Sequence, residues 1–293
     1  MDLPFPFLDH LNEQLSAAGA PVAIDEVIPV GGGSINDAYR LVTKKGTYFL
    51  KTNRADRYPS MFEAEADGLA HLRAPMAIRV PELMVQGTFA DLSFLVLEYV
   101  PKGPKDDKFW RTFGTQLATL HRTSASHFGL DRPNYIGSLV QVNTQENDWH
   151  SFLVQHRLEP MVKMGRDNGK LAAPIALRCE RLYGRIDGLF PQEAPSLLHG
   201  DLWQGNFLCT EDGAPVLVDP AVYFGHREMD LAMTHLFGGF ESAFHIAYHD
   251  AWPLEKGWQE RVEICQLYPL LVHANLFAGN YVQQVDAILK RFV

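Results

Sequence analysis

Residues 196–233 read SLLHGDLWQGNFLCTEDGAPVLVDPAVYFGHREMDLAM, and this stretch decides the fold. Apolar runs such as Val216-Leu217-Val218 predict short buried strands. Polar side chains stand directly beside these runs, at His199, Asp201, Asn206 and Asp219. Ionisable groups at the ends of buried strands conflict with simple core packing, and such conflicts are typical of functional sites. We therefore expect a site here and interpret the rest of the chain around it.

The spacing from Asp201 to Asn206 is that of the protein-kinase catalytic loop, where an Asp accepts the proton of the acceptor hydroxyl and an Asn binds metal. Asp219 follows the next predicted strand and stands where the second metal-binding Asp of that arrangement would stand. Phosphoryl transfer needs one carboxylate to orient the alcohol and hard oxygen ligands to hold Mg²⁺ on the phosphates. The set predicts Asp201 as the catalytic residue, Asn206 and Asp219 as Mg²⁺ ligands, and ATP as the phosphoryl donor.

Two other interpretations fit parts of the stretch. His199 and Asp201 form a His-X-Asp pair, which supplies two of the three ligands of a non-haem iron site, with His226 or His235 as the third. This iron site would leave the Asn and the second Asp of the kinase set without a role. In a purely structural interpretation both Asp residues only cap turns, as we expect for the hairpin turn Asp212-Gly213.

The composition limits the class of protein. The 293 residues are 46% hydrophobic, enough for one large domain or two lobes. The formal net charge of −9 argues against general affinity for nucleic acid or anionic membranes, and no apolar run of about 18 residues predicts a membrane span. The first Lys or Arg is Arg40, so the N-terminal region lacks the charge of a signal or transit peptide. The scattered cysteines Cys179, Cys209 and Cys265 suit a reducing compartment, and we predict a cytoplasmic protein.

A glycine-rich loop lies between two predicted strands near the N-terminus. After a predicted helix over residues 5–18, strand patterns at 22–30 and 38–42 flank the sequence GGGSIN. Glycines between strands let the backbone approach phosphate oxygens closely. The spacing fits neither the Walker P-loop nor the dinucleotide fingerprint, and a flexible turn is the alternative. The residues that we predict to contact the nucleotide here are Gly31, Gly32, Gly33, Ser34 and Asn36.

A Lys–Glu pair is predicted next. The strand over 47–51 ends at Lys51, and the following helix, over 62–72, carries Glu63 and Glu65. In kinases such a pair holds the Lys against the α- and β-phosphates. We choose Glu65 because it lies nearer the apolar stripe of its helix. A solvated surface Lys51 is the alternative.

The strand-rich part of the chain ends near residue 100. Strand patterns at 81–88 and 91–100 precede Pro101-Lys102-Gly103-Pro104, a break that suits a hinge, and from residue 105 the apolar period becomes helical. The backbone groups that we predict to hydrogen-bond an adenine edge belong to Glu98, Tyr99 and Val100. We predict an α+β chain with a nucleotide-binding lobe at 1–100, a hinge at 101–104 and a helical catalytic and acceptor-binding lobe at 105–293.

Helical patterns continue to the C-terminus, over 149–164, 172–190 and, as two helices, 258–293. A polar loop at 134–143 either lines an acceptor pocket or packs as a connector. Asp230, near the start of another predicted helix, is expected to cap that helix and to brace the catalytic loop. His121 is expected to be a core or capping residue. The residues that we predict for the sugar pocket, because they flank the catalytic groups, are Trp203, Tyr223 and Glu228.

Several motifs are spread over nearly the whole chain: GGGSIN at 31–36, FEAEADGL at 62–69, FGLDRPNYIG at 128–137, HGDLWQGN at 199–206, DPAVYFGHREMDLA at 219–232 and LYPLLVH at 267–273. They resemble those of the fructosamine kinase (ketosamine-3-kinase) family, which is related to aminoglycoside phosphotransferases and choline kinases. The motifs that begin at His199 and Asp219 are the most specific. Ser34 stands where some relatives have Cys, so redox control through a disulfide of this loop is not expected.

The resemblance implies a bilobal protein-kinase-like fold, with a five-stranded antiparallel sheet and a helix in the N-terminal lobe and a mostly helical C-terminal lobe. It implies ATP- and Mg²⁺-dependent phosphorylation of the sugar 3-hydroxyl of ketosamines, with ribulosamines or erythrulosamines favoured over fructosamines. The phosphorylated adduct falls apart and frees the amine, so the implied role is deglycation.

Two alternatives stay open at this point. One is a kinase of another alcohol, such as an aminoglycoside, choline or a hydroxylated metabolite. The other is a nucleotide-binding regulator without catalysis, although such proteins usually lack at least one of the four residues that correspond to Lys51, Asp201, Asn206 and Asp219. The expected partners are ketosamine small molecules or glycated proteins, without nucleic acid or membrane, and the expected state is a monomer.

Overall fold

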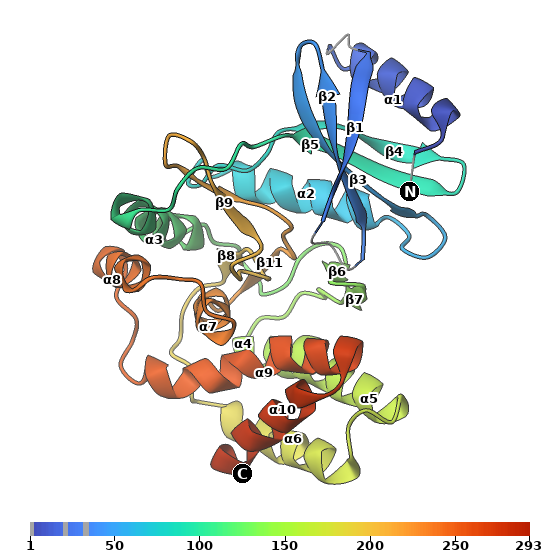
Figure 1. The fold of residues 1–293 in the computed structure, drawn as a ribbon. Coiled ribbons are helices and arrows are strands. Elements are labelled where there is room, and N and C mark those ends of the chain that lie inside the picture. The colour runs from blue at the N-terminus through green and yellow to red at the C-terminus, as the bar shows by residue number, and fades with distance from the viewer. Residues whose placement is uncertain (1–2, 20–22, 32–34) are drawn as a thin grey trace.

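The computed structural model of the protein describes residues 3–19, 23–31 and 35–293. Its N-terminal part contains a five-stranded sheet with strand order β1-β2-β3-β5-β4, in which all neighbours run antiparallel (Figure 1). The strands are β1 (Ile24–Val30), β2 (Asp37–Thr43), β3 (Gly46–Arg54), β4 (Leu83–Phe89) and β5 (Leu92–Glu98). They lie close to where the sequence predicts them, but β3 continues past Lys51 to Arg54, and β5 ends at Glu98 instead of Val100.

Two helices cover opposite faces of this sheet (Figure 1). Helix α1 (Phe5–Ala17) packs on the face that carries Val96, and α2 (Met61–Arg73) packs on the face that carries Leu95. The two faces differ because successive side chains of a strand point to opposite sides. Helix α2 thereby comes to lie between the sheet and the helical part of the chain (Figure 1).

Helices dominate the chain after residue 106. They are α3 (Asp107–His121), α4 (Trp149–Leu153), α5 (Glu159–Asp167), α6 (Ala173–Ile186), α7 (Glu228–Leu236), α8 (Ser242–Ala251), α9 (Trp258–Phe277) and α10 (Asn280–Phe292). Short antiparallel pairs lie among them: β6 (Asn134–Ile136) with β7 (Leu139–Gln141), β8 (Ser196–Leu198) with β11 (Tyr223–Gly225), and β9 (Phe207–Cys209) with β10 (Pro215–Leu217). The α+β class is therefore as predicted. No helix of the described residues is long and apolar enough to cross a membrane.

The helix predicted over 149–164 is not continuous. A π-helical turn, Val154–Leu158, separates α4 from α5. Pro160 follows at the start of α5, and it has no N–H to donate to the carbonyl four residues earlier. The loss of this bond gives a physical reason for the change of helical register here.

Helix α8 was not predicted, because its sequence SAFHIAYHDA mixes polar and apolar residues without a clear period. Tertiary packing on α3 defines it instead. A Cβ atom on Gly114 of α3 would lie only 2.2 Å from the Phe244 carbonyl oxygen, so glycine permits the close approach of the two helices. The Phe113 and Phe244 rings pack edge to face, with centroids 5.0 Å apart.

The short strand pairs bring two loops of the opening stretch together. Loop 199–206 follows β8, and segment 218–222 links β10 to β11. Backbone hydrogen bonds join them, from Ala221 N to His199 O at 2.9 Å and from Val218 N to Asn206 O at 3.0 Å. The predicted turn at Asp212-Gly213 is present between β9 and β10, with φ of +81° at the glycine. The polar residues predicted for the site thus lie on two loops that form one unit.

Candidate active site

His199 is a structural residue of this unit. Its ring is buried, with Nε2 2.9 Å from Val218 O and Nδ1 3.2 Å from Asp201 N. With the proton on Nε2, the ring donates to the carbonyl and accepts from the amide. Burial lowers the pKa of His199, which keeps the ring neutral. Both ring nitrogens are occupied by the backbone, so this geometry does not support the iron interpretation.

Asp230 of α7 braces loop 199–206, as predicted. Its Oδ2 accepts from His199 N at 2.7 Å and its Oδ1 from Gly200 N at 2.9 Å. Burial opposes ionisation of this carboxyl, but the hydrogen bonds from His121 and the Gly200 amide hold its pKa below the usual value. His121 lies in the core between Asp230 and Tyr248. The predicted cap is absent, since α7 has no side-chain N-cap bond.

Asp201 and Asn206 face each other across the loop. The Asn206 amide nitrogen donates to Asp201 Oδ2 and to Asp201 O, both at 2.9 Å. Burial raises the pKa of Asp201 to about 7, and the charges of Asp219 and Asp230 add to this increase, whereas the bond from Asn206 opposes it. A carboxyl with a pKa near neutrality is suited to general base catalysis.

Lys51 joins the sheet to these loops. Its Nζ lies 2.7 Å from Glu65 Oε1 on α2 and 2.6 Å from Asp219 Oδ1. Burial alone would lower the pKa of Lys51, but Asp219 and Glu65 raise it, so the ammonium stays charged. Glu63 instead lies 3.9 Å from Arg132 at the surface, which confirms the choice of Glu65 as the partner. Lys51 is buried and is not a solvated surface residue.

Two backbone features position Asp219. Helix α2 packs directly on the segment that follows it, where a Cβ on Gly68 would lie 3.3 Å from the Val222 side chain and 3.4 Å from that of Pro220. Asp219 itself has φ of +54°, a left-handed conformation that costs about 1–3 kcal/mol for a non-glycine residue. Such strain concentrates at functional sites, where the surrounding structure maintains it.

The oxygens of Asn206 and Asp219 suit Mg²⁺. The amide nitrogen of Asn206 is used by Asp201, which orients its Oδ1 away from that bond. In the part of the chain that the structure describes, no hydrogen-bond donor reaches Asn206 Oδ1 or Asp219 Oδ2. The Asp219 side chain is 46% exposed, so a cation can reach it. Hard carboxylate and amide oxygens are the donors that this ion prefers.

The nucleotide-binding predictions are placed only in part. Gly32, Gly33 and Ser34 lie outside the described residues, while Gly31 and Asn36 flank them. Asn36 Oδ1 accepts from Asn53 Nδ2 of β3 at 3.0 Å, which ties this end of the loop to the strand that carries Lys51.

The other nucleotide-binding predictions fall at the end of β5. Glu98 is the last residue of the strand, its N–H donates to Glu82 O at 2.8 Å, and its carboxylate pairs with Arg79. Tyr99 and Val100 follow the strand, and no backbone hydrogen bond of theirs occurs among the described residues. Their backbone groups remain candidates for an adenine edge.

The three residues predicted for the sugar pocket lie in different surroundings. Tyr223 is buried, with its ring 5.6 Å from that of Phe152 and 4.0 Å from the Arg157 guanidinium. Glu228 is buried in a two-pronged ion pair with Arg261, at 2.7 and 2.5 Å. Tyr223 is 1% exposed and Glu228 is 3% exposed, and their place in a sugar pocket stays a prediction. Trp203, which is partly exposed, keeps the predicted location beside Asp201.

Trp203 begins a chain of aromatic contacts that sequence reasoning missed. Its ring lies 6.3 Å from that of Phe237, which lies 4.9 Å from that of His273. His273 also contacts Phe277 at 5.7 Å and Tyr281 at 5.0 Å. We call Trp203, Phe237, His273, Phe277 and Tyr281 the aromatic platform. His273 and Phe277 lie on α9, Tyr281 lies on α10, and Trp203 and Phe237 lie outside the helices and strands. Only the LYPLLVH motif, which ends at His273, gave a local signal.

The loop at 134–143 packs on the segment around Asp219 through buried side chains, while Val140 and Val142 are exposed. Asn134 Nδ2 donates to Val222 O at 2.7 Å, and Gln141 Nε2 donates to Ala221 O at 3.1 Å. Both amides are buried. They tie the β6–β7 pair to the segment that carries Asp219, so they help to position this candidate metal ligand.

The comparisons with known proteins agree with this arrangement. The family model described as fructosamine kinase matches residues 8–293. A probable ketoamine kinase of Enterococcus faecium is 41% identical over 91% of this chain and 95% of that protein. The chloroplastic protein-ribulosamine 3-kinase of Arabidopsis thaliana is 34% identical over 97% of this chain and 88% of that protein.

A solved structure has the same fold. The crystal structure of a putative fructosamine-3-kinase from Haemophilus somnus 129PT superposes with a TM-score of 0.88, at 28% identity, over 97% of this chain and 96% of that one. This match confirms the predicted kinase-like α+β architecture. With residues 8–293 matched by the family model and 97% of the chain covered by the superposition, the chain belongs to the fructosamine kinase family.

Proposed function

We propose that this chain transfers the γ-phosphoryl group of ATP to the sugar 3-hydroxyl of a ketosamine. The observation that carries the proposal is one arrangement: Lys51 is held by Glu65 and contacts Asp219, while Asn206 contacts Asp201. This is the constellation that phosphoryl transfer to an alcohol requires. Membership of a family of kinases that act on alcohols supports the same reaction.

Asp201 is the proposed catalytic residue. Asn206 occupies its Oδ2, which leaves Oδ1 to accept a hydrogen bond from the sugar hydroxyl. As the hydroxyl oxygen bonds to the γ-phosphorus, the bond from phosphorus to the ADP oxygen breaks and Asp201 takes the hydroxyl proton. Mg²⁺ held by Asn206 and Asp219 would neutralise charge on the phosphates. Lys51 supplies a fixed positive charge for the α- and β-phosphates.

The proposed organisation has two lobes, residues 1–100 and 105–293, with a hinge at 101–104. ATP would lie between them, with the loop from Gly31 to Asn36 over its phosphates and the backbone of residues 98–100 at its adenine. Gly103, in the proposed hinge, packs against the β9–β10 hairpin. Its N–H donates to Cys209 O at 2.8 Å, and a Cβ on Gly103 would lie 2.3 Å from Thr210 O. These contacts hold this end of the hinge against the C-terminal lobe.

The aromatic platform is the proposed acceptor surface. It starts at Trp203, two residues from Asp201, and extends to Phe277, which is 56% exposed. Aromatic faces bind the apolar faces of sugar rings and attract amines through cation–π interactions. The plant relative is named for ribulosamines, and we propose a ribulosamine or erythrulosamine as the preferred sugar adduct. Action on free or protein-bound adducts, a monomeric state and a cytoplasmic location stay predictions.

A substrate panel tests the proposal. Purified protein with Mg²⁺ and ATP is assayed for ADP formation with ribulose-lysine, erythrulose-lysine, fructose-lysine, choline and an aminoglycoside, with Asp201→Asn as the inactive control. Turnover confined to the ketosamines supports the proposal and ranks the sugars. Turnover only with choline or the aminoglycoside would keep the mechanism and replace the substrate. ATP binding without turnover on any acceptor would favour the non-catalytic regulator.

A further inference from the structure

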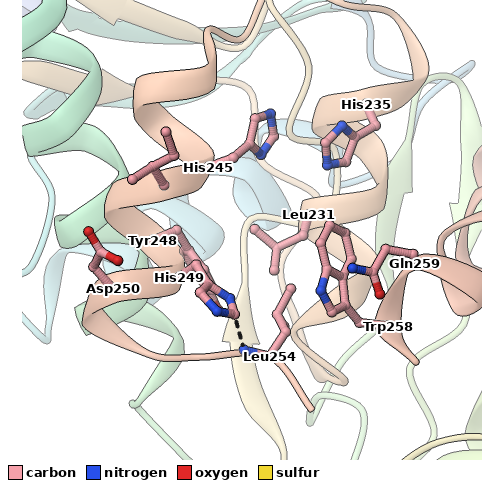
Figure 2. Close-up of a pocket in the computed structure, with 10 residues that line it drawn as sticks. Leu231, His235, His245, Tyr248, His249, Asp250, Leu254, Trp258 and Gln259 are labelled. Carbon is pink, nitrogen blue, oxygen red and sulfur yellow. Dashed lines mark hydrogen bonds between the residues drawn. The ribbon is translucent and has the colours of Figure 1, made fainter. Parts of the chain in front are cut away.

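A cavity of about 470 Å³ lies between α7, α8 and the start of α9 (Figure 2). Small-molecule sites in proteins typically measure about 300–1,000 Å³. None of its ten lining residues belongs to the proposed nucleotide, metal or acceptor positions. The cavity is therefore large enough for a ligand of its own.

One wall of the cavity is aromatic. His245 of α8 and His235 of α7 stack with ring centroids 4.1 Å apart and planes at 11°. Trp258 of α9 lies 6.2 Å from His235, with planes at 27°. Three aromatic rings from three helices thus line one region, where Figure 2 shows the imidazoles of His235 and His245 and the indole of Trp258 beside the open space. Such a wall favours a planar aromatic ligand.

The wall is polar but carries no positive charge. Burial lowers the pKa of His235 and, together with repulsion from His235, lowers that of His245 to about 4, so both rings are neutral at pH 7. Each neutral ring offers one donor and one acceptor, and within the described chain neither has a hydrogen-bond partner. No Lys or Arg lines the cavity, and Asp250 is its one carboxylate. An anionic ligand would find no counter-charge here.

The cavity is linked to the catalytic loop by three hydrogen bonds in series. Tyr248 lines it, and the Tyr248 hydroxyl lies 2.9 Å from His121 Nδ1. His121 Nε2 lies 3.2 Å from Asp230 Oδ2, and this same oxygen accepts from His199 N at 2.7 Å. Leu231, the residue after Asp230, also lines the cavity. A ligand that shifts α7 or α8 would therefore displace the carboxylate that holds the loop.

We propose that this cavity binds an uncharged planar heterocycle that has both an N–H donor and a nitrogen acceptor, and that its occupancy alters turnover through Tyr248, His121 and Asp230. A bicyclic ring that lies edge to edge with the imidazoles can meet the free donor and acceptor nitrogens of His235 and His245, because those nitrogens form hydrogen bonds in the plane of their rings. The consequence is a second, regulatory site in a molecule whose proposed reaction needs only the first.

Binding is tested with benzimidazole at pH 8, where it is neutral, by calorimetry on the full chain saturated with ADP. We expect one site, with binding about tenfold weaker in His245→Leu, which keeps the bulk of the side chain and loses its hydrogen bonds. His127→Leu, a His outside the cavity, should leave affinity unchanged. Benzimidazole-5-carboxylate, a matched anion, should bind about tenfold more weakly than benzimidazole. No binding, or equal binding by His245→Leu, would refute the site.

The coupling between the cavity and the catalytic loop is tested with Tyr248→Phe, which keeps the ring that lines the cavity and removes the hydroxyl that contacts His121. Benzimidazole should change kcat at least about twofold in the unaltered chain and not in the variant, while both bind it equally. A response that persists in Tyr248→Phe, or binding without any change of kcat in the unaltered chain, would overturn the coupling. The binding assay uses no acceptor, so its failure is distinct from failure of the proposed kinase reaction.

Discussion

Asp201→Asn should stabilise the protein and abolish its turnover. The folded-state pKa of Asp201 is about 7, against an ordinary value of 3.8. At a pH between these two pKa values, the unfolded chain has lost the proton that the folded chain still binds. The Asp201 carboxyl therefore lowers the free energy of unfolding by an amount that grows as pH rises toward 7. The two pKa values differ by about three pH units, and at about 1.4 kcal/mol per unit this sets an upper limit of about 4 kcal/mol on the destabilisation above pH 7. Because the carboxyl is partly exposed, we expect a gain of about 1 kcal/mol at pH 5 and about 2 kcal/mol at pH 8.

Urea unfolding of the two proteins at pH 5, 6, 7 and 8, without nucleotide or metal, measures this gain. Asp25→Asn is the matched control, since Asp25 is exposed on β1 and its removal should change stability by less than about 0.5 kcal/mol. Turnover of Asp201→Asn should fall by orders of magnitude at every pH. The reasoning is refuted if Asp201→Asn is no more stable than the unaltered chain at pH 8, or if the difference does not grow with pH.

Three further variants test the parts of the site separately. Asp230→Asn leaves one of the two backbone N–H groups facing an amide nitrogen. This should lower the free energy of unfolding in urea by about 3 kcal/mol and lower kcat about 100-fold. A loss of stability under about 1 kcal/mol would show that Asp230 does not hold the loop. Gly200→Ala puts a Cβ 2.0 Å from the Ala221 carbonyl oxygen, at a residue with φ of +84°. It should lower Tm far more than Gly213→Ala, because Gly213 has a similar φ but open space around it. Equal losses of Tm would mean that the structure around Gly200 relaxes to accommodate the Cβ. Lys51→Met should raise KM for ATP and lower kcat by about 100-fold or more. The helix content measured by circular dichroism should stay constant. Unchanged kinetics would show that Lys51 does not contact the nucleotide.

The sequence was most informative where chemistry depends on short spacing. Asp201 and Asn206 lie on one loop, and the pairing of β2, β3 and β5 places Lys51 at a predictable strand position opposite α2. The side of the helix that carries Glu65 followed from its apolar stripe. These residues are constrained by local periodicity, which is visible without any structure.

Local patterns say little about surroundings where neighbours along the chain point in different directions in space. Tyr223 and Glu228 flank the catalytic motifs, and no pattern in the sequence indicated that their side chains are buried against Arg157 and Arg261. Conversely, Phe237 and His273 meet through packing of segments about 36 residues apart, for which no local pattern exists. Helix α8 likewise depends on its contact with α3 and not on its own period.

The ion pairs of Lys51 indicate how the two halves of the site work together. The catalytic loop and the segment around Asp219 are joined by backbone hydrogen bonds and behave as one unit. Lys51 reaches this unit from the sheet through Asp219, whose Oδ1 it contacts at 2.6 Å, while Glu65 holds it from the other side. A cation shared by Asn206 and Asp219 would weaken the attraction between Asp219 and Lys51, whereas the pair with buried Glu65 would remain. Lys51 is therefore expected to keep Glu65 and to exchange Asp219 for the nucleotide phosphates, which makes Asp219 the residue where metal binding and phosphate binding meet.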